Sequence, residues 1–359
     1  MECRIETNLL KKMVSKAVKG AGMNKMLPIT NMMLLKGDST GFYIVTTDGL
    51  NTFSVKNTEP FRNDFYVVLP VDTFSKLVAK MSCESITMEV EGNVLTLTGN
   101  GKYKIPLPND EEGLLTFPEP KLEIPATSVK EIKASFVKAI INANKSALAK
   151  NLTVPCLCGY YLGEDEVIST DENVACFTTI NLLGEPRLLS AVTLDLLALT
   201  NYENIFYEVC GNKLVFTSED MQLVTEEIEG RDIYPVEPLT QLLESGNYSS
   251  YCKIPKLLLL SVLDRLSLFV EPYDKNAVVF KFTPDGLQVN SMKSSAVETI
   301  SYVVSTNFEP FSAFVDMIQL KSIINTFPSE DITIHYGAEG SLQLTCDNTT
   351  YIISLLTEV

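Results

Sequence analysis

Histidine occurs only once in the 359 residues, and long apolar runs are missing. The first absence leaves His335 as the single candidate for a histidine general base, yet "ITIHYG" alternates in a way that predicts a solvent-facing strand residue. The second absence excludes a membrane-spanning helix, which needs about 20 apolar residues. The N-terminal "MECRIETNLLKKM" also lacks the apolar core of a signal peptide. We therefore expect a cytoplasmic protein that makes no membrane contact.

Motifs for catalysis and for metal binding are missing as well. The eight cysteines form no CxxC pair, and the two thiols of "PCLCGYY", Cys156 and Cys158, are only half of a zinc site even if they face the same way on a strand. "KGAGMNK" does not match the phosphate-binding GxxxxGK[ST] pattern. We expect reduced structural thiols, no metal, no cofactor and no catalytic residue. An unrelated hydrolase that uses Cys158 is an alternative.

Acidic residues are missing from two long windows of an otherwise acidic chain. The net charge is −16, yet residues 7–37 hold six lysines and residues 132–163 hold four, with no Asp or Glu in either window. Such windows are either solvated helix faces or surfaces that meet phosphates. The contrast with the rest of the chain favours the phosphate-binding interpretation.

One hairpin pattern occurs three times along the chain. Residues 86–107, "ITMEVEGNVLTLTGNGKYKIPL", alternate as two strands joined by a Glu-Gly-Asn turn, and similar text begins at Ile205 and at Ile332. The spacing between the starts of successive hairpins is about a third of the chain, which is too long for a solenoid repeat. The pattern therefore predicts three related domains.

Two helices are predicted in each repeat. In residues 67–81, Phe74, Leu77, Val78 and Met81 recur at helical spacing after a short strand, and the other repeats carry similar text. The helical segments, with a strand leading into the second of each pair, are 8–20 and 67–81, 135–148 and 187–202, and 255–269 and 311–327. Pro-rich text at 117–127 and at 235–250 predicts linkers. We therefore expect three tandem α+β domains, at 1–119, 124–245 and 246–359.

Several short motifs, taken in their order along the three repeats, resemble the bacterial sliding clamp, the beta subunit of DNA polymerase III holoenzyme. They are "LPITNMMLL" (27–35), "TTDG" (46–49), "VVLPVDTFSKLV" (67–78), "STDENVA" (169–175), "EGRDIYP" (229–235) and "YIISLL" (351–356). The resemblance covers all three repeats and implies a non-catalytic processivity factor. It implies a head-to-tail homodimer that closes into a pseudo-sixfold ring around duplex DNA. It also implies partners that bind through short linear motifs, namely the polymerase and clamp-loader subunits.

The resemblance places basic residues of the helices against DNA, which they would contact without reading its sequence. The implied DNA-facing residues are Lys11, Lys12, Lys16, Lys19, Lys25, Lys76, Lys80, Lys133, Lys138, Lys145, Lys150 and Arg265. The lining is expected to be uneven, because the first helix of the third repeat carries Asp264 beside its basic residues and residues 193–204 hold no basic residue. A clamp-like decoy that does not close or does not bind clients is an alternative function.

The resemblance also implies a dimer interface and a client-peptide pocket. The interface positions are Tyr103, Ile105, Leu268 and Phe269, although the last two could equally be helix core. The pocket positions are Leu157, Thr170, Glu172, Ala175, Ile352, Leu355 and Leu356. The sequence departs from the family at Glu172, where glycine is common, and in the tail "SLLTEV", which lacks the family's proline and ends in Glu358 and Val359. The alternative for the tail is that it only completes the last sheet.

Overall fold

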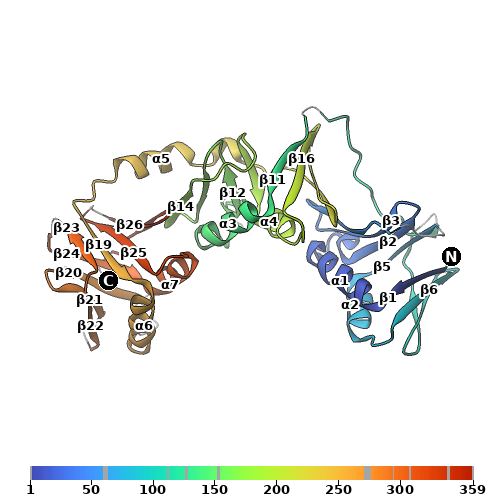
Figure 1. Cartoon of the computed structure of the whole chain (residues 1–359), viewed down its shortest axis with the longest axis horizontal. Coiled ribbons are helices and arrows are strands. Elements are labelled where there is room, and N and C mark those ends of the chain that lie inside the picture. Colours follow the sequence, from blue (N-terminus) through green and yellow to red (C-terminus); the bar gives the residue numbers. More distant parts are fainter. Residues whose placement is uncertain are drawn as a thin grey trace. The chain divides into compact units, whose positions relative to one another are not determined.

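The protein is an α+β structure of antiparallel sheets and short helices, seen here in a computed structural model (Figure 1). The structure describes residues 2–59, 64–110, 113–125, 128–151, 154–270, 276–293, 295–306, 309–337 and 340–357. The chain divides into two compact units, Met1–Val137 with Val192–Glu227 and Lys138–Ala191 with Ile228–Val359. The predicted fold class is confirmed.

The first unit contains a four-stranded sheet in the order β1-β6-β7-β8 and an eight-stranded sheet in the order β11-β16-β17-β18-β4-β3-β2-β5. A two-stranded ribbon, β9 and β10, completes it. Its elements, with α3 and α4 crossing into the second unit, are β1 (Glu2–Glu6), α1 (Thr7–Ala17), η1 (Val18–Gly20), η2 (Pro28–Asn31), β2 (Met32–Asp38), β3 (Gly41–Thr47), β4 (Thr52–Asn57), β5 (Phe65–Pro70), α2 (Val71–Lys80), β6 (Ser85–Glu91), β7 (Val94–Thr98), β8 (Lys102–Pro106), β9 (Asn109–Asp110), β10 (Gly113–Leu114), β11 (Lys130–Lys133), α3 (Ala134–Asn144), α4 (Ala191–Leu197), β16 (Asn204–Cys210), β17 (Lys213–Thr217) and β18 (Met221–Thr225).

The second unit contains a nine-stranded sheet in the order β15-β12-β13-β14-β27-β26-β25-β19-β23 and a four-stranded sheet in the order β22-β21-β20-β24. Its elements are η3 (Lys145–Ala147), η4 (Pro155–Cys158), β12 (Gly159–Leu162), β13 (Val167–Thr170), β14 (Val174–Thr178), β15 (Arg187–Ser190), η5 (Arg231–Ile233), α5 (Val236–Ser245), β19 (Ser250–Pro255), α6 (Lys256–Leu266), η6 (Ser267–Phe269), β20 (Ala277–Thr283), β21 (Gly286–Ser291), β22 (Val297–Ile300), β23 (Val304–Thr306), β24 (Phe311–Asp316), α7 (Met317–Thr326), β25 (Asp331–Tyr336), β26 (Ser341–Cys346) and β27 (Thr349–Ser354).

One order of elements recurs three times along the chain: strand, helix, three strands, strand, helix, three strands. It runs from β1 to β8, from β11 to β18, and from β19 to β27, where α5 precedes the third run and β23 is added within it. The three predicted hairpins are therefore confirmed. Gly92 and Gly211, with φ of +56° and +65°, make the tight turns of the first two hairpins, a conformation that glycine adopts without strain. Because both compact units take residues from the middle repeat, the three domain boundaries stay a prediction.

Helices pack against the sheets through the apolar stripe that the spacing predicts. In the first unit, α1 and α2 lie side by side and bury Leu10, Met13, Phe74 and Val78 (Figure 1). Burial of each such side chain contributes about 1.5–3 kcal/mol. The opposite face of the two helices is thereby left for polar and basic residues.

The segment predicted as a linker at 235–250 contains a ten-residue helix, α5. Val236, Leu239 and Leu243, spaced i, i+3 and i+7, pack against a buried apolar cluster of the second unit. Pro238 lies in the first turn of the helix, where its missing N–H costs nothing. The linker prediction was therefore wrong for these residues, because the prolines masked the helical spacing. The described part of 117–127 contains neither helix nor strand, as predicted.

Repeats join through continuous sheets. In the first unit β18 pairs antiparallel with β4, and in the second β14 pairs antiparallel with β27. Beside the first joint, the Nζ of Lys16 on α1 lies 2.7 Å from the Oδ2 of Asp220, in the turn between β17 and β18. Asp220 also accepts hydrogen bonds from the Thr200 hydroxyl (2.8 Å) and the Asn201 N–H (3.1 Å). Lys16 therefore holds the joint together.

Asp220→Asn is expected to lower the free energy of unfolding at pH 7 by about 2 kcal/mol, because Lys16 loses a largely buried partner. Burial alone would raise the pKa of Asp220, but the bonds from Lys16, Thr200 and Asn201 outweigh it and leave that pKa below its ordinary value. Ionised Asp220 therefore stabilises the fold above pH ~4, and the stabilisation is lost as the pH falls through the lowered pKa.

Urea denaturation at several pH values measures both effects. The difference in unfolding free energy between wild type and Asp220→Asn should shrink as the pH is lowered from neutral. Glu84→Gln, which removes an exposed carboxylate of the same unit, is the matched control and should change little. An Asp220→Asn variant as stable as wild type at neutral pH would show that the ion pair contributes nothing to the joint.

Candidate functional site

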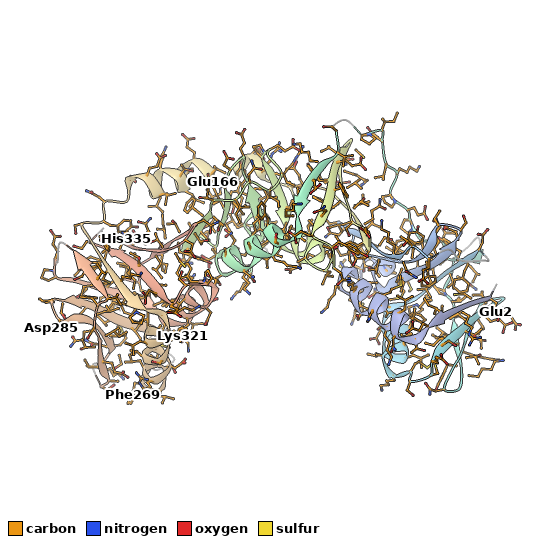
Figure 2. All side chains as sticks on the ribbon, in the orientation of Figure 1. Glu2, Glu166, Phe269, Asp285, Lys321 and His335 are labelled. Carbon is orange, nitrogen blue, oxygen red and sulfur yellow. The ribbon has the colours of Figure 1, made fainter. Side chains whose placement is uncertain are left out.

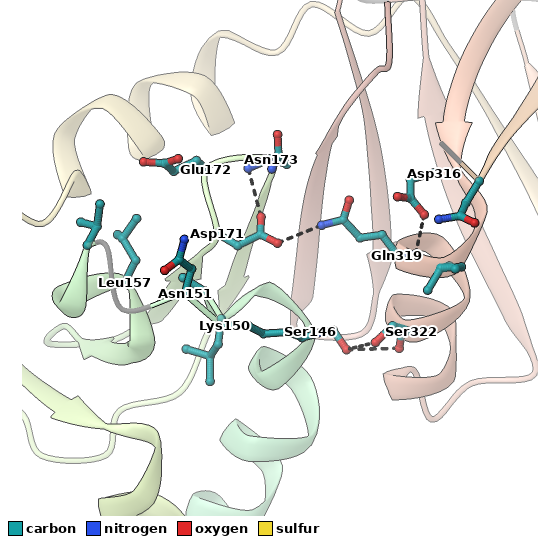
Figure 3. Close-up of a pocket in the computed structure, with 15 residues that line it drawn as sticks. Ser146, Lys150, Asn151, Leu157, Asp171, Glu172, Asn173, Asp316, Gln319 and Ser322 are labelled. Atoms are coloured by element: carbon teal, nitrogen blue, oxygen red, sulfur yellow. Dashed lines mark hydrogen bonds between the residues drawn. The ribbon is translucent and has the colours of Figure 1, made fainter. Parts of the chain in front are cut away.

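A cavity of about 590 Å³ opens in the second unit where three stretches of chain meet (Figure 3). One is the segment around η3, from Ser146 to Asn151, another is the turn between β13 and β14, and the third is the start of α7. Val154 and Leu157 on one side and Ile318 on the other supply apolar surface. The cavity is thus a cleft with apolar walls and a polar rim, which is the usual form of a ligand site.

The turn between β13 and β14 is held by its own side chains. The Oδ1 of Asp171 accepts the N–H groups of Asn173 (3.0 Å) and Val174 (2.8 Å), and the Thr170 hydroxyl donates to the carbonyl of Val174 (2.7 Å). Glu172, the next residue, has φ of +77°, a left-handed conformation that favours glycine. The turn therefore holds an exposed carboxylate at the rim in a strained backbone conformation.

Hydrogen bonds tie the turn and η3 to α7. The Nε2 of Gln319 donates to the Oδ2 of Asp171 (3.0 Å), and the hydroxyls of Ser146 and Ser322 lie 2.9 Å apart (Figure 3). Asp316 caps α7 by accepting the Gln319 N–H at 2.9 Å. Because Asp171 and Asp316 are both engaged in this way, Glu172 is the rim carboxylate left to face a ligand.

An apolar cluster underlies the β12–β14 end of the nine-stranded sheet. It contains Cys156, Leu157, Ala175, Tyr234 and Ile352, and α5 packs on it from outside. Cys156 and Cys158 lie in the 3₁₀ turn η4, not on a strand. Burial, then the neighbouring Cys156, raises the pKa of Cys158, which is the opposite of what an activated thiol needs. The cluster is a packed floor without a reactive group.

The structure distributes the predicted pocket residues over three positions. Leu157 and Glu172 line the cavity. Thr170, Ala175 and Ile352 are buried beneath it. Leu355 and Leu356 are half-buried, and their N–H groups donate to the carbonyls of Gly340 and Phe314. Glu358 and Val359 lie outside the described residues.

Sequence reasoning missed the contribution of α7 to this cavity. Ile318, which is 58% exposed, and Gln319 lie on α7, far along the chain from the other walls. No local pattern signals this approach, because it depends on the pairing of β14 with β27. Lys150, predicted to face DNA, lies instead in the coil after η3 and lines the cavity.

The predicted DNA-facing cations fall into two groups. Four are engaged with carboxylates: Lys16 with Asp220, Lys76 with Asp72, Lys133 with Glu131 and Arg265 with Glu298. The remaining eight make no ion pair with any residue that the structure describes. They are Lys11, Lys12, Lys19, Lys25, Lys80, Lys138, Lys145 and Lys150. Lys25, like Lys150, lies in coil and not on a helix.

The predicted interface residues divide between surface and core. Leu268 and Phe269, in η6, are 81% and 49% exposed, which is unlike helix core, and Phe269 lies at the periphery of its unit (Figure 2). Tyr103 on β8 is exposed, whereas Ile105 on the same strand is buried in its own sheet. Exposed large apolar side chains of this kind mark association surfaces.

His335, the single histidine of the chain, lies on β25 of the second unit. His335 donates or accepts one hydrogen bond with the Thr345 hydroxyl (3.2 Å), and burial lowers its pKa. Among the described residues, no three His, Cys, Asp or Glu side chains gather as a metal site. None of the helices in these residues is both long and apolar enough to cross a bilayer.

Comparison with known proteins identifies the architecture. Residues 1–114 match the family model of the DNA polymerase III beta subunit, N-terminal domain. Solved structures match over the whole chain: the beta chain of Streptococcus pneumoniae DNA polymerase III (TM-score 0.85, 16% identity, 99% of each chain) and the Bacillus subtilis sliding clamp (0.84, 16%, 99% of each). A Bartonella birtlesii sliding clamp matches similarly (0.86, 14%, 99% of this chain and 100% of that one). No curated protein is detectably similar in sequence. Residues 1–114 are thus similar to the N-terminal domain of the DNA polymerase III beta subunit, and the fold of the chain over its whole length is that of the solved bacterial sliding clamps.

Proposed function

We propose that the protein is a DNA sliding clamp, a non-catalytic processivity factor that encircles duplex DNA and tethers a polymerase. The observation that carries the proposal is a clamp fold that covers 99% of both chains, joined to the DNA polymerase III family model at the N-terminus. The unpaired lysines of α1, α2 and α3 support it, since they are unusual in a chain of net charge −16. They would attract any duplex without reading its sequence, which permits sliding.

The repeat itself supports ring closure. At each internal joint, the last strand of one repeat pairs with the fourth strand of the repeat before it: β18 with β4, and β27 with β14. Two strands in corresponding places, β8 and β22, form the outer edges of their sheets. Pairing β8 of one subunit with β22 of another would repeat the same joint and remove both open edges. Two such pairings per dimer would close a ring, with the charges of Lys102 and Lys104 opposite that of Glu298.

The cleft beside α7 is proposed as the site for client peptides, including segments of polymerase and clamp-loader subunits. Its apolar walls suit leucine or phenylalanine anchors. The Glu172 carboxylate on the rim disfavours acidic flanks and favours basic ones by charge repulsion and attraction. Glu358 was expected to act in the same way but lies outside the described residues.

A topological experiment tests the encirclement. The protein is mixed with linear duplex, the DNA ends are ligated into a circle, and the mixture is passed over a sizing column at about 0.5 M salt, which screens surface charge. Protein that encircles DNA should elute with the circle and be released when a restriction enzyme cuts it. A decoy that does not close would leave the circle at this salt before any cut, and that outcome would contradict the proposal.

A further inference from the structure

We infer that a lysine-rimmed groove between α1 and α2 is the principal contact with the DNA backbone, and that the corresponding surface of α6 and α7 makes none. The inference rests on the proposed function and deepens it, because it assigns the DNA contact to one part of the subunit. The groove between α1 and α2 has a volume of about 660 Å³. Four lysines line it: Lys11, Lys12, Lys19 and Lys76.

The chemistry of the groove suits a sugar–phosphate backbone. Its floor includes Val14 and Val78, and its rim carries the lysine ammonium groups. Only Lys76 of the four is paired, with Asp72 in the same helix at 2.6 Å. That pair is well exposed, so it is weak and free to exchange for a phosphate. The remaining charges have no competitor among the described residues, so an anion is the complementary occupant.

The corresponding positions in the third repeat do not hold lysines. When α6 is aligned with α1 and α7 with α2 from their first residues, the four lysine positions hold other residues, namely Leu260, Ser261, Leu268 and Ser322. At the positions of Ser15 and Ser75, which line the first groove, stand Asp264 and Lys321. These two side chains form an ion pair that joins α6 to α7.

Three further cations on β19 and α6 are also engaged. Arg265 donates two hydrogen bonds to Glu298, at 2.8 and 2.6 Å, and Lys253 lies 3.3 Å from Asp331. The ammonium group of Lys256 donates to the carbonyl of Phe327. In the second repeat, the alignment of α3 with α1 retains one lysine of the four, Lys138. The capacity to neutralise phosphates therefore falls from the first repeat to the third.

Salt dependence of DNA binding tests the inference. Anisotropy of a labelled short duplex is measured against salt for wild type and for Lys12→Gln/Lys19→Gln, which removes two exposed charges and keeps good helix formers. The log–log slope should become shallower by about 1.8, since each phosphate contact contributes about 0.9. The double variant Arg265→Gln/Lys321→Gln should show the same log–log slope as wild type. The surface control Lys121→Gln/Lys281→Gln should also keep the wild-type slope.

Each outcome decides one question. Equal loss of slope in the Lys12/Lys19 and Arg265/Lys321 variants would overturn the inference and leave the clamp proposal intact. Absence of duplex binding by wild type at low salt would count against the clamp proposal itself. Polyglutamate that binds wild type but not Lys12→Gln/Lys19→Gln, while the variant keeps the wild-type DNA slope, would assign the groove to an acidic peptide and overturn the inference. Circular dichroism confirms that each variant is folded.

Discussion

Replacement of Leu268 with aspartate should turn the proposed dimer into a monomer, raising the dissociation constant of the two subunits by about 30-fold to 100-fold. Leu268 is 81% exposed in η6, just after the end of α6, and the neighbouring Phe269 is 49% exposed. Arg265 and Glu298 hold this helix end beside β22, the edge strand proposed to pair with β8. A carboxylate placed there would be buried without a partner on association, and that cost adds to the lost apolar contact.

Sedimentation velocity over a concentration series measures this shift. Leu257→Asp is the matched control, because Leu257 is 76% exposed at the start of α6, the helix that leads into η6. It should leave the association unchanged, and both variants should melt like wild type because the replaced side chains lie at the surface. A Leu268→Asp protein that dimerises as tightly as wild type would place the subunit interface elsewhere.

Local elements of this fold could be predicted from the sequence because their signals are local. The alternation in 86–107 and the Gly92 turn specify β6 and β7 without reference to any other part of the chain. The apolar spacing from Phe74 to Met81 specifies α2 in the same way, to within a residue of its end. Helix α5 was missed although its spacing was present, since Pro235 and Pro238 were interpreted as linker residues.

Contacts between distant segments could not be predicted from the sequence. These contacts decide which basic residues have a carboxylate partner and which do not. Lys16 and Lys12 look alike in the sequence, one turn apart on α1. Only the pairing of β18 with β4 brings Asp220 to Lys16 and leaves Lys12 without a carboxylate among the described residues. The same reasoning applies to Arg265, whose partner Glu298 lies on β22. Which of the predicted DNA-facing residues have a carboxylate partner is therefore decided by tertiary structure, and their contact with DNA stays a prediction.

The cleft proposed for client peptides was predictable in part. "STDE" at 169–172 identified the turn and Glu172, because the family resemblance and the turn chemistry of Asp171 agree there. The α7 wall with Ile318 has no such signal, since its approach depends on two strands, β14 and β27, that meet across the nine-stranded sheet. The strongest test of the cleft therefore uses a residue that the structure alone supplies.

Ile318→Asp should weaken client-peptide binding by about 30-fold, because an apolar anchor would lose its wall and meet a charge instead. Ile318 is 58% exposed, so its replacement leaves no cavity in the core. It is also the second residue of α7, and a carboxylate in the first turn of a helix is favoured by the helix dipole. The variant is therefore expected to fold like wild type.

The measurement is anisotropy of two labelled peptides that share leucine and phenylalanine anchors and differ only in lysine or glutamate flanks. Wild type should prefer the lysine-flanked peptide because of Glu172, and Ile318→Asp should weaken the binding of both peptides. Ile233→Asp, at a residue 70% exposed in η5 that does not line the cavity, is the control and should bind as wild type does. Retained affinity in a folded Ile318→Asp variant would mean that the clients dock outside this cleft, because no anchor could keep its apolar contact beside the new charge.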